Sequence, residues 1–110
     1  LPSEVAGRQA IERLLRENAK FDAIFATSDL VAIGAMRELH EAGQSIPGDI
    51  AVVGFDDLAA ARMADPQLTT IAQDTRRAGE ILVETLLARI ENREAASVLL
   101  PVRLVVRGST

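Results

Sequence analysis

The chain has 110 residues, a formal net charge of −4 and an apolar fraction of 48%, and it contains no cysteine, tryptophan or tyrosine. A chain of this length buries about 65% of its unfolded surface, so one small soluble domain needs no disulfide or metal for stability. The lack of cysteine excludes disulfide frameworks, thiolate zinc sites and thiol catalysis.

Charged residues make up 25% of the chain, and acids and bases are interspersed. A DNA-binding surface needs a basic patch, which this sequence lacks: Lys20 is its only lysine and the arginines are scattered. No apolar run approaches the roughly 20 residues of a membrane span, and no signal sequence opens the chain. We therefore expect a cytoplasmic protein, and we expect that this segment binds neither DNA nor a membrane.

The first elements follow from helical spacing and from a short apolar run. Ser3 is placed to cap a helix whose apolar residues recur at helical spacing to about residue 18. Residues 23–26 then form an apolar run with Phe25 near its end, which predicts a strand buried on both faces.

A second helix and strand complete a crossover unit. Ser28 or Asp29 caps a helix that Gly43 ends in the left-handed conformation. The apolar run 50–55 predicts the next strand. Strand, helix and strand joined by short connections predict a parallel crossover in an α/β fold.

The remaining sequence predicts a short helix at 58–64, a brief strand at 68–73, a helix at 75–90, and strands at 98–100 and 102–106 separated by Pro101. The helix at 75–90 is apolar around much of its circumference. Such a helix needs cover on more than one side.

Polar side chains follow the predicted strands at the edge where an open parallel sheet binds ligands. They are Thr27, Ser28 and Asp29 after the first strand, Asp56 and Asp57 after the second, and Gln73 at the end of the third. Carboxylates, hydroxyls and an amide can bind a hydroxylated or amine-bearing ligand.

Helix capping accounts for Ser28 and Asp29 about as well as ligand contact does. A cap on the short helix needs only one acid of the pair Asp56 and Asp57, which leaves the other for a different role. Gln73 taken alone is more typical of an ordinary surface residue.

Catalytic interpretations lack the necessary partners. His40, the only histidine, is expected near the polar end of a helix, which favours a solvated side chain. Adjacent acids could bind Mg²⁺, as in phosphoryl-accepting receiver domains, but no lysine follows Lys20 to meet a phosphoryl group. Serine catalysis lacks its base, and no glycine-rich phosphate loop is present. We expect no enzymatic activity, no cofactor and no metal.

A series of motifs extends over nearly the whole chain: FDAIFATSD at 21–29, AIGA at 32–35, EAG at 41–43, IPGDI at 46–50, VVGFDD at 52–57, LTTI at 68–71 and LPVRLVVRGST at 100–110. In this order they resemble the lactose-repressor/galactose-repressor family of bacterial transcription regulators. The resemblance implies the type I periplasmic-binding-protein-like fold, with two α/β lobes of mostly parallel sheet flanked by helices and a small molecule between them.

The resemblance implies an effector-binding role for Ser28, Asp29, Asp56, Gln73 and Thr75. Ser28 stands where the family often has an asparagine or serine that contacts the effector. Asp56 matches an acid that typically bonds effector hydroxyls. Thr75 occupies a position where an aromatic residue can occur, so stacking of a sugar on this chain is not implied.

The resemblance also implies a homodimer or larger assembly. The family pairs protomers through the helix that carries Ile33 and through the stretch around Arg62, Met63 and Ala64. Packing in the core of one chain is the other explanation for the apolar residues, and the sequence leaves both open.

The resemblance begins in the middle of the family pattern, without the helix-turn-helix, the hinge, the first lobe and the opening strands of the second. It implies that residues 1–110 are the carboxy-terminal segment of the effector-binding and dimerisation domain, with the helix at 75–90 belonging to the missing first lobe. Exposed in isolation, that helix predicts self-association.

The function implied is that of a repressor-type regulator that responds to a sugar or related metabolite and binds operator DNA only through the missing amino-terminal domain. The alternative is a sugar-binding protein of a transport system, which shares the fold. A signal peptide upstream would favour transport, and a helix-turn-helix would favour regulation.

Overall fold

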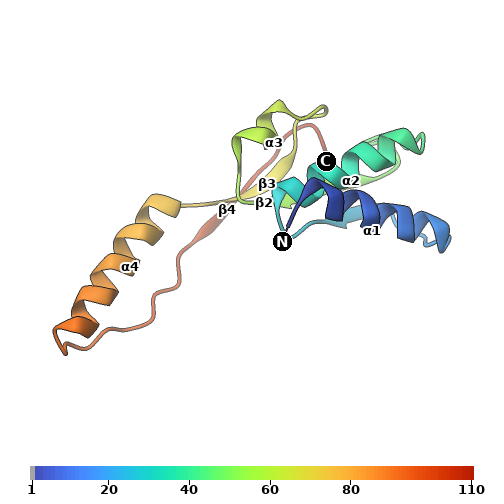
Figure 1. The fold of residues 1–110 in the computed structure, drawn as a ribbon. Helices are drawn as coiled ribbons and strands as arrows, with labels where there is room; N and C mark the ends of the chain where they lie inside the picture. The colour runs from blue at the N-terminus through green and yellow to red at the C-terminus, as the bar shows by residue number, and fades with distance from the viewer. Residues whose placement is uncertain (1) are drawn as a thin grey trace. The chain divides into compact units, whose positions relative to one another are not determined.

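The computed structural model describes residues 2–110, and the chain divides into two units. The first unit extends to Ala72 and takes in Leu104–Thr110, and the second is Gln73–Arg103. Figure 1 shows the elements in chain order: α1 (Glu4–Arg16), β1 (Ala23–Phe25), α2 (Asp29–Glu41), β2 (Ala51–Phe55), α3 (Ala59–Met63), β3 (Thr69–Gln73), α4 (Thr75–Ile90) and β4 (Val102–Val105).

Local capping sets the helix boundaries as the sequence predicts. The hydroxyls of Ser3 and Ser28 accept hydrogen bonds from backbone N–H groups in the first turns of α1 and α2. The carboxylate of Asp74 does the same for α4. Gly43, just beyond α2, has a φ of 78°. This is the left-handed conformation in which helices commonly end, and glycine adopts it most easily because it has no side chain.

The four strands form one sheet in the order β1-β2-β3-β4. β1 pairs with β2 in parallel, with Ile24 opposite Val52, and β2 pairs with β3 in parallel, with Gly54 opposite Thr70. Because α2 joins β1 to β2 and packs against β2, the predicted parallel crossover is confirmed.

The prediction that the first strand is buried on both faces is wrong. Phe25 is 65% exposed, and Ala23 is exposed as well. β1 lies at the end of the strand order, and within residues 2–110 no strand pairs with its outer side. An edge strand buries less of its surface than a central one, which explains the difference.

The predicted strand at residues 98–100 is also wrong, because this segment has no regular secondary structure. Leu99 is 97% exposed and Val98 is 57% exposed. Pro101, which lacks a backbone N–H, follows the segment, and β4 begins only at Val102.

Two glycines let α1 and α2 pack closely. A Cβ atom added to Gly34 would lie 1.9 Å from the carbonyl oxygen of Glu4, and one added to Gly7 would lie 2.1 Å from that of Val31. Arg8 of α1 adds ion pairs to Glu38 and Glu41 of α2 at 3.2 and 2.6 Å. The close approach therefore depends on residues without side chains at both positions.

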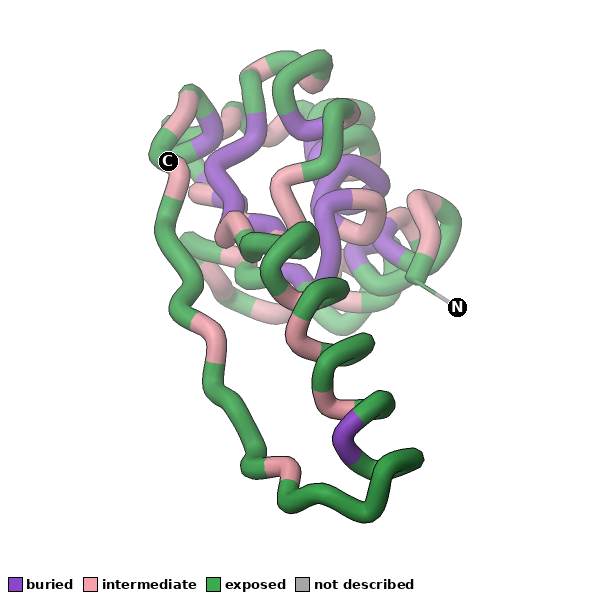
Figure 2. Tube along the Cα trace, turned by 90° about the vertical axis from the view of Figure 1, so that its left-hand side faces the viewer, coloured by how far each residue is buried: buried purple, intermediate pink, exposed green. Residues whose placement is uncertain are grey.

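The core of the first unit lies around α2, whose buried residues include Ala32, Met36 and Leu39. Neighbouring segments contribute further buried residues to it, among them Ile11 of α1, Val52 of β2 and Leu68. In Figure 2, the buried segments gather in this unit.

The second unit exposes most of its apolar surface. Ala88 is buried in α4. The exposed apolar residues of α4 are Leu82, Val83, Leu86, Leu87 and Ile90. The wide apolar face of α4 predicts packing against other segments, and within the described residues no segment covers it.

Candidate functional site

The polar residues after β1 and β2 lie at one edge of the sheet, because the two strands run parallel. Asp29, at the start of α2, packs over β2. A Cβ atom added to Gly54 would lie 2.4 Å from Oδ1 of Asp29. The glycine of the VVGFDD motif therefore makes room for a carboxylate at this edge.

Ser28 and Asp29 both serve the fold at this edge. The Ser28 hydroxyl accepts a hydrogen bond from the backbone N–H of Val31 at 3.3 Å, and the residue is 7% exposed. The capping role that the sequence offers as one of two explanations for Ser28 is thus realised.

Asp29 is fully buried, and each oxygen of its carboxylate accepts a hydrogen bond from the chain. Oδ1 accepts from the Thr70 hydroxyl at 2.5 Å. Oδ2 accepts from the backbone N–H of Leu58 at 2.7 Å. A buried carboxylate needs such donors to offset the loss of water. Asp29 thereby ties α2 to β3 and to the segment after β2.

Asp56 and Asp57 form an unusual turn directly after β2. Their φ angles are 111° and 53°, in the region that side-chain-bearing residues rarely adopt. The N–H of Asp56 donates to the carbonyl oxygen of Ile71 at 2.9 Å, and the N–H of Asp57 lies 3.4 Å from the Thr70 hydroxyl. Strained backbone of this kind persists only where the surroundings hold it, and it concentrates at functional sites.

Neither Asp56 nor Asp57 occupies the cap position of α3. The residue at the cap position is Leu58, which makes no side-chain capping hydrogen bond. Asp57 forms a largely buried ion pair with Arg107, whose Nη2 donates to Oδ1 at 2.5 Å. Arg62, in α3, lies 3.5 Å from Oδ2 of the same carboxylate.

Gln73 and Thr75 belong to the second unit and are exposed there. Gln73 is the last residue of β3, and Thr75 is the first residue of α4. Between them, Asp74 caps the helix through a 2.8 Å hydrogen bond from the N–H of Arg77.

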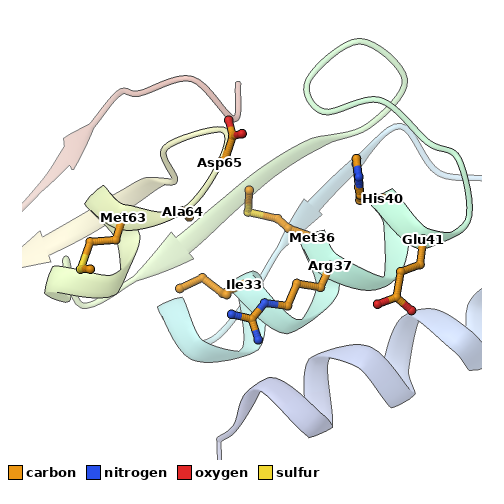
Figure 3. A pocket seen from close by; sticks show the side chains of 8 residues that line it. All are labelled: Ile33, Met36, Arg37, His40, Glu41, Met63, Ala64 and Asp65. Atoms are coloured by element: carbon orange, nitrogen blue, oxygen red, sulfur yellow. The ribbon is translucent and has the colours of Figure 1, made fainter.

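A groove of about 380 Å³ lies on the first unit beside α2 (Figure 3). Its wall on α2 consists of Ile33, Met36, Arg37, His40 and Glu41, and its other wall consists of Met63, Ala64 and Asp65. Three of the four residues expected at a dimer interface therefore line one groove. Met63 is 83% exposed there, whereas Ile33 is 7% exposed.

The fourth expected interface residue, Arg62, is not among the residues that line the groove. Its side chain is 64% exposed and extends to Asp57 of the turn. His40, expected to be solvated, is exposed at the groove.

Two residues that hold the candidate site together, Thr70 and Arg107, are not apparent from the sequence pattern. Thr70 contacts both Asp29 and the Asp57 N–H, and Arg107 binds the Asp57 carboxylate. Arg107 is an isolated base near the chain end, and its partner lies 50 positions earlier, so no local pattern marks it. The only available signal for Thr70 is its place in the LTTI motif.

No group of three or more metal-binding side chains that could hold an ion occurs within residues 2–110. Over the same residues, no helix is long and apolar enough to cross a membrane.

The fold and this edge define a class of protein. A parallel α/β sheet whose strands end in carboxylates and hydroxyls is the arrangement of ligand-binding α/β lobes, which bind at the carboxyl ends of their strands. The comparisons with known proteins agree. A sequence model of the periplasmic binding protein-like domain matches residues 1–110.

Two curated relatives are transcriptional repressors by name. The chain is 40% identical over 104 residues to a lactose operon repressor of Rhizobium radiobacter, covering 94% of the chain and 92% of that protein. It is also 40% identical over 86 residues to a ribose operon repressor of Haemophilus influenzae, covering 78% of the chain and 26% of that protein.

Two solved structures share the fold closely. The transcriptional regulator CelR in complex with cellobiose matches with a TM-score of 0.92 and 35% identity, over 98% of this chain and 34% of that chain. The Lac repressor dimer bound to operator and an anti-inducer matches with a TM-score of 0.91 and 38% identity, over 98% of this chain and 38% of that chain.

The chain belongs to the lactose-repressor/galactose-repressor family and carries sequence of its periplasmic-binding-protein-like effector domain. The expected family and fold are thereby confirmed. The chain spans about a quarter of the ribose operon repressor and between a third and two fifths of the two structures.

Proposed function

We propose that this chain is the carboxy-terminal segment of the effector-binding and dimerisation domain of a repressor-type transcriptional regulator. The observation that carries the proposal is the 40% identity to a lactose operon repressor over nearly the whole chain. The close structural match to a regulator holding cellobiose supports a sugar or related metabolite as the effector. No catalytic step, cofactor or metal is part of this function.

The proposed effector-binding residues of the first unit are Ser28 and Asp56, with Asp29 as a buried support, and those of the second unit are Gln73 and Thr75. Asp56 is the central residue, because a carboxylate on a strained turn at a strand end is suited to accept hydrogen bonds from sugar hydroxyls. Both oxygens of Asp29 already accept hydrogen bonds inside the lobe, which favours a supporting role over direct contact.

The groove beside α2 is the proposed dimer surface. It combines apolar side chains, including the largely exposed Met63, with a polar rim formed by Arg37, Glu41 and Asp65. An apolar centre with a polar rim is typical of protein interfaces. The Lac repressor that matches this chain is itself described as a dimer. Arg62 lies beside the groove residue Met63 and is proposed as a rim contact.

The helix at 75–90 is proposed to pack in the first lobe of the complete domain. Its exposed apolar residues and the division of the chain at Gln73 support this assignment. The operator would be bound by an amino-terminal domain outside these residues, in the cytoplasm. Effector binding would then shift operator affinity only through different affinities for two arrangements of the lobes.

The test uses the complete protein with D-ribose, lactose and cellobiose as probes, each titrated by calorimetry and added to an electrophoretic mobility shift assay with operator DNA. We expect one of these sugars to bind and to alter operator affinity. The variant Asp56→Asn should lose this response while still binding operator, and Asp22→Asn, at the opposite end of β1, should keep it. Operator binding that no sugar alters, in the wild type as in the variant, would refute the sugar-effector role.

The transport alternative is less well supported, because both named curated relatives are repressors. The coding sequence upstream distinguishes the two functions: a signal peptide would establish transport, and a helix-turn-helix would establish regulation.

A further inference from the structure

The turn at Asp56 and Asp57 needs an external support. Two consecutive residues with side chains adopt positive φ angles of 111° and 53°. Neither is glycine, for which such angles carry no steric penalty. A turn of this kind relaxes unless neighbouring groups fix its conformation.

The support comes from the end of the chain. Nη2 of Arg107 donates to Oδ1 of Asp57 at 2.5 Å, and Nη1 donates to the carbonyl oxygen of Leu68 at 2.9 Å. The backbone N–H of Arg107 donates to the Thr69 hydroxyl at 2.8 Å. One guanidinium thus connects the turn to the chain just before β3, while its own backbone is fixed to β3.

This ion pair is shielded from solvent. The Arg107 side chain is 11% exposed and the Asp57 side chain is 13% exposed. Burying two charges costs desolvation free energy, and an apolar pair of similar size often stabilises a fold as well. The planar fork of arginine supplies what an apolar pair lacks, which is directional bonds to two fixed acceptors.

The segment that carries Arg107 is itself firmly held. The Ser109 hydroxyl donates to the carbonyl oxygen of Val52 at 2.6 Å and accepts from the N–H of Thr69 at 2.8 Å. Ser109 is fully buried. The guanidinium therefore projects from an anchored backbone rather than from a loose end.

We propose that Arg107 and Asp57 are positioning residues of the effector site, because their ion pair fixes the strained turn from which Asp56 projects. The inference rests on the proposed role of Asp56 in effector binding. It assigns to the last residues of the chain a part in effector affinity, although they touch no effector themselves.

The first measurement needs no ligand. In the complete protein, hydrogen exchange resolved to single amides should show the N–H groups of Asp56, Asp57 and Leu58 protected in the wild type. Arg107→Ala should speed exchange at these amides by about tenfold or more. Arg103→Ala, an exposed arginine in β4, serves as the matched control and should leave them unchanged.

The second measurement is calorimetric titration of the same variants with D-ribose, lactose and cellobiose. Arg107→Ala should weaken the affinity of the sugar that binds by about tenfold, the size expected for one lost hydrogen bond to a charged group. Arg107→Lys keeps the charge but replaces the planar fork with a single flexible ammonium group, so its sugar affinity should lie between those of the wild type and of Arg107→Ala. Adding Asp57→Asn to Arg107→Ala should weaken the sugar affinity little further, because the two residues act through the same ion pair.

The outcomes separate this inference from the proposed function. Unchanged exchange at the turn in both Arg107 variants, or unchanged sugar affinity despite faster exchange, would overturn the positioning role. An affinity loss matched by an equal loss in Arg103→Ala would do the same. If no sugar binds the wild type, the sugar-effector function fails, and the exchange data alone decide whether Arg107 fixes the turn.

Discussion

The Thr70 hydroxyl donates to the buried carboxylate of Asp29 across 2.5 Å and joins β3 to the start of α2. The two residues are 41 positions apart in the chain and both are completely buried. The same hydroxyl lies 3.4 Å from the N–H of Asp57. Thr70 thus connects both polar strand ends of the proposed effector edge.

Replacing Thr70 with valine should therefore destabilise the protein by about 1–3 kcal/mol, because the buried carboxylate of Asp29 loses a donor while the side-chain volume is kept. Urea denaturation followed by circular dichroism measures the change. Thr27→Val, at an exposed position, is the matched control and should change stability little. Equal stability of the two variants would show that the buried hydrogen bond contributes nothing.

Close packing of α1 on α2 makes Gly34 sensitive to substitution. Gly34→Ala would place a Cβ atom 1.9 Å from the carbonyl oxygen of Glu4, so the helices must separate. Overpacking of this kind costs roughly 1–3 kcal/mol. Gly79→Ala in α4 meets nothing within 4 Å and should stabilise its helix by up to about 1 kcal/mol. Thermal denaturation of both variants tests the contrast, which a stable Gly34→Ala protein would contradict.

The sequence predicts what depends on near neighbours. The hydroxyls of Ser3 and Ser28 each accept a hydrogen bond from the N–H three residues ahead, and Gly43 is left-handed because the helix ends there. These features follow from local spacing alone. The order of the motifs also indicates the fold, because the family resemblance covers nearly the whole chain.

Contacts between distant segments account for what the sequence did not predict. The partner of Asp57 is Arg107, 50 positions later, and the partner of Asp29 is Thr70. Chain pattern does not reveal which acid faces which donor, so the sequence leaves both capping and effector contact open for Asp29 and does not mark Arg107 at all. The exposure of Phe25 does not follow from its local sequence either, because whether a strand lies at the edge of a sheet depends on the strands that pair with it.

The Asp49 carboxylate gives a prediction about pH. The Ser45 hydroxyl and the Ser45 backbone N–H donate to its Oδ2 at 2.6 and 2.8 Å and hold the pKa of Asp49 below its ordinary value of 3.8. The pKa of Asp49 is lower in the folded than in the unfolded protein. The carboxylate therefore contributes its full stabilisation of the fold above the unfolded pKa, and this contribution is lost as the pH falls through the folded pKa. Ser45→Ala should raise the pKa of Asp49 towards 3.8 in a carboxyl carbon NMR titration. Ser97→Ala should leave that titration curve in place, and a curve that Ser45→Ala fails to move would contradict the assignment.

The groove beside α2 predicts a charge-sensitive dimer. Met63→Glu places a carboxylate in an apolar centre that includes Ile33, and it should weaken the dimer of the complete protein by about tenfold or more. Analytical ultracentrifugation over a range of concentrations measures the dissociation constant. Val5→Glu introduces the same charge at an exposed apolar position of α1, which is 62% exposed, and should leave the dissociation constant unchanged. A dimer that tolerates Met63→Glu would place the interface elsewhere.

The exposed apolar face of α4 predicts that the isolated 110-residue chain self-associates. Leu82 and Leu86 are 69% and 59% exposed, and Ile90 is 66% exposed, on one helix that lacks cover within residues 2–110. Contiguous apolar surface of this kind is uncommon on small monomers and drives association. Sedimentation velocity should show species larger than a monomer that become monomeric in the double variant Leu82→Glu/Leu86→Glu. Val5→Glu, on α1, should still associate. A wild-type chain that sediments as a monomer at high concentration would show that this face needs no partner.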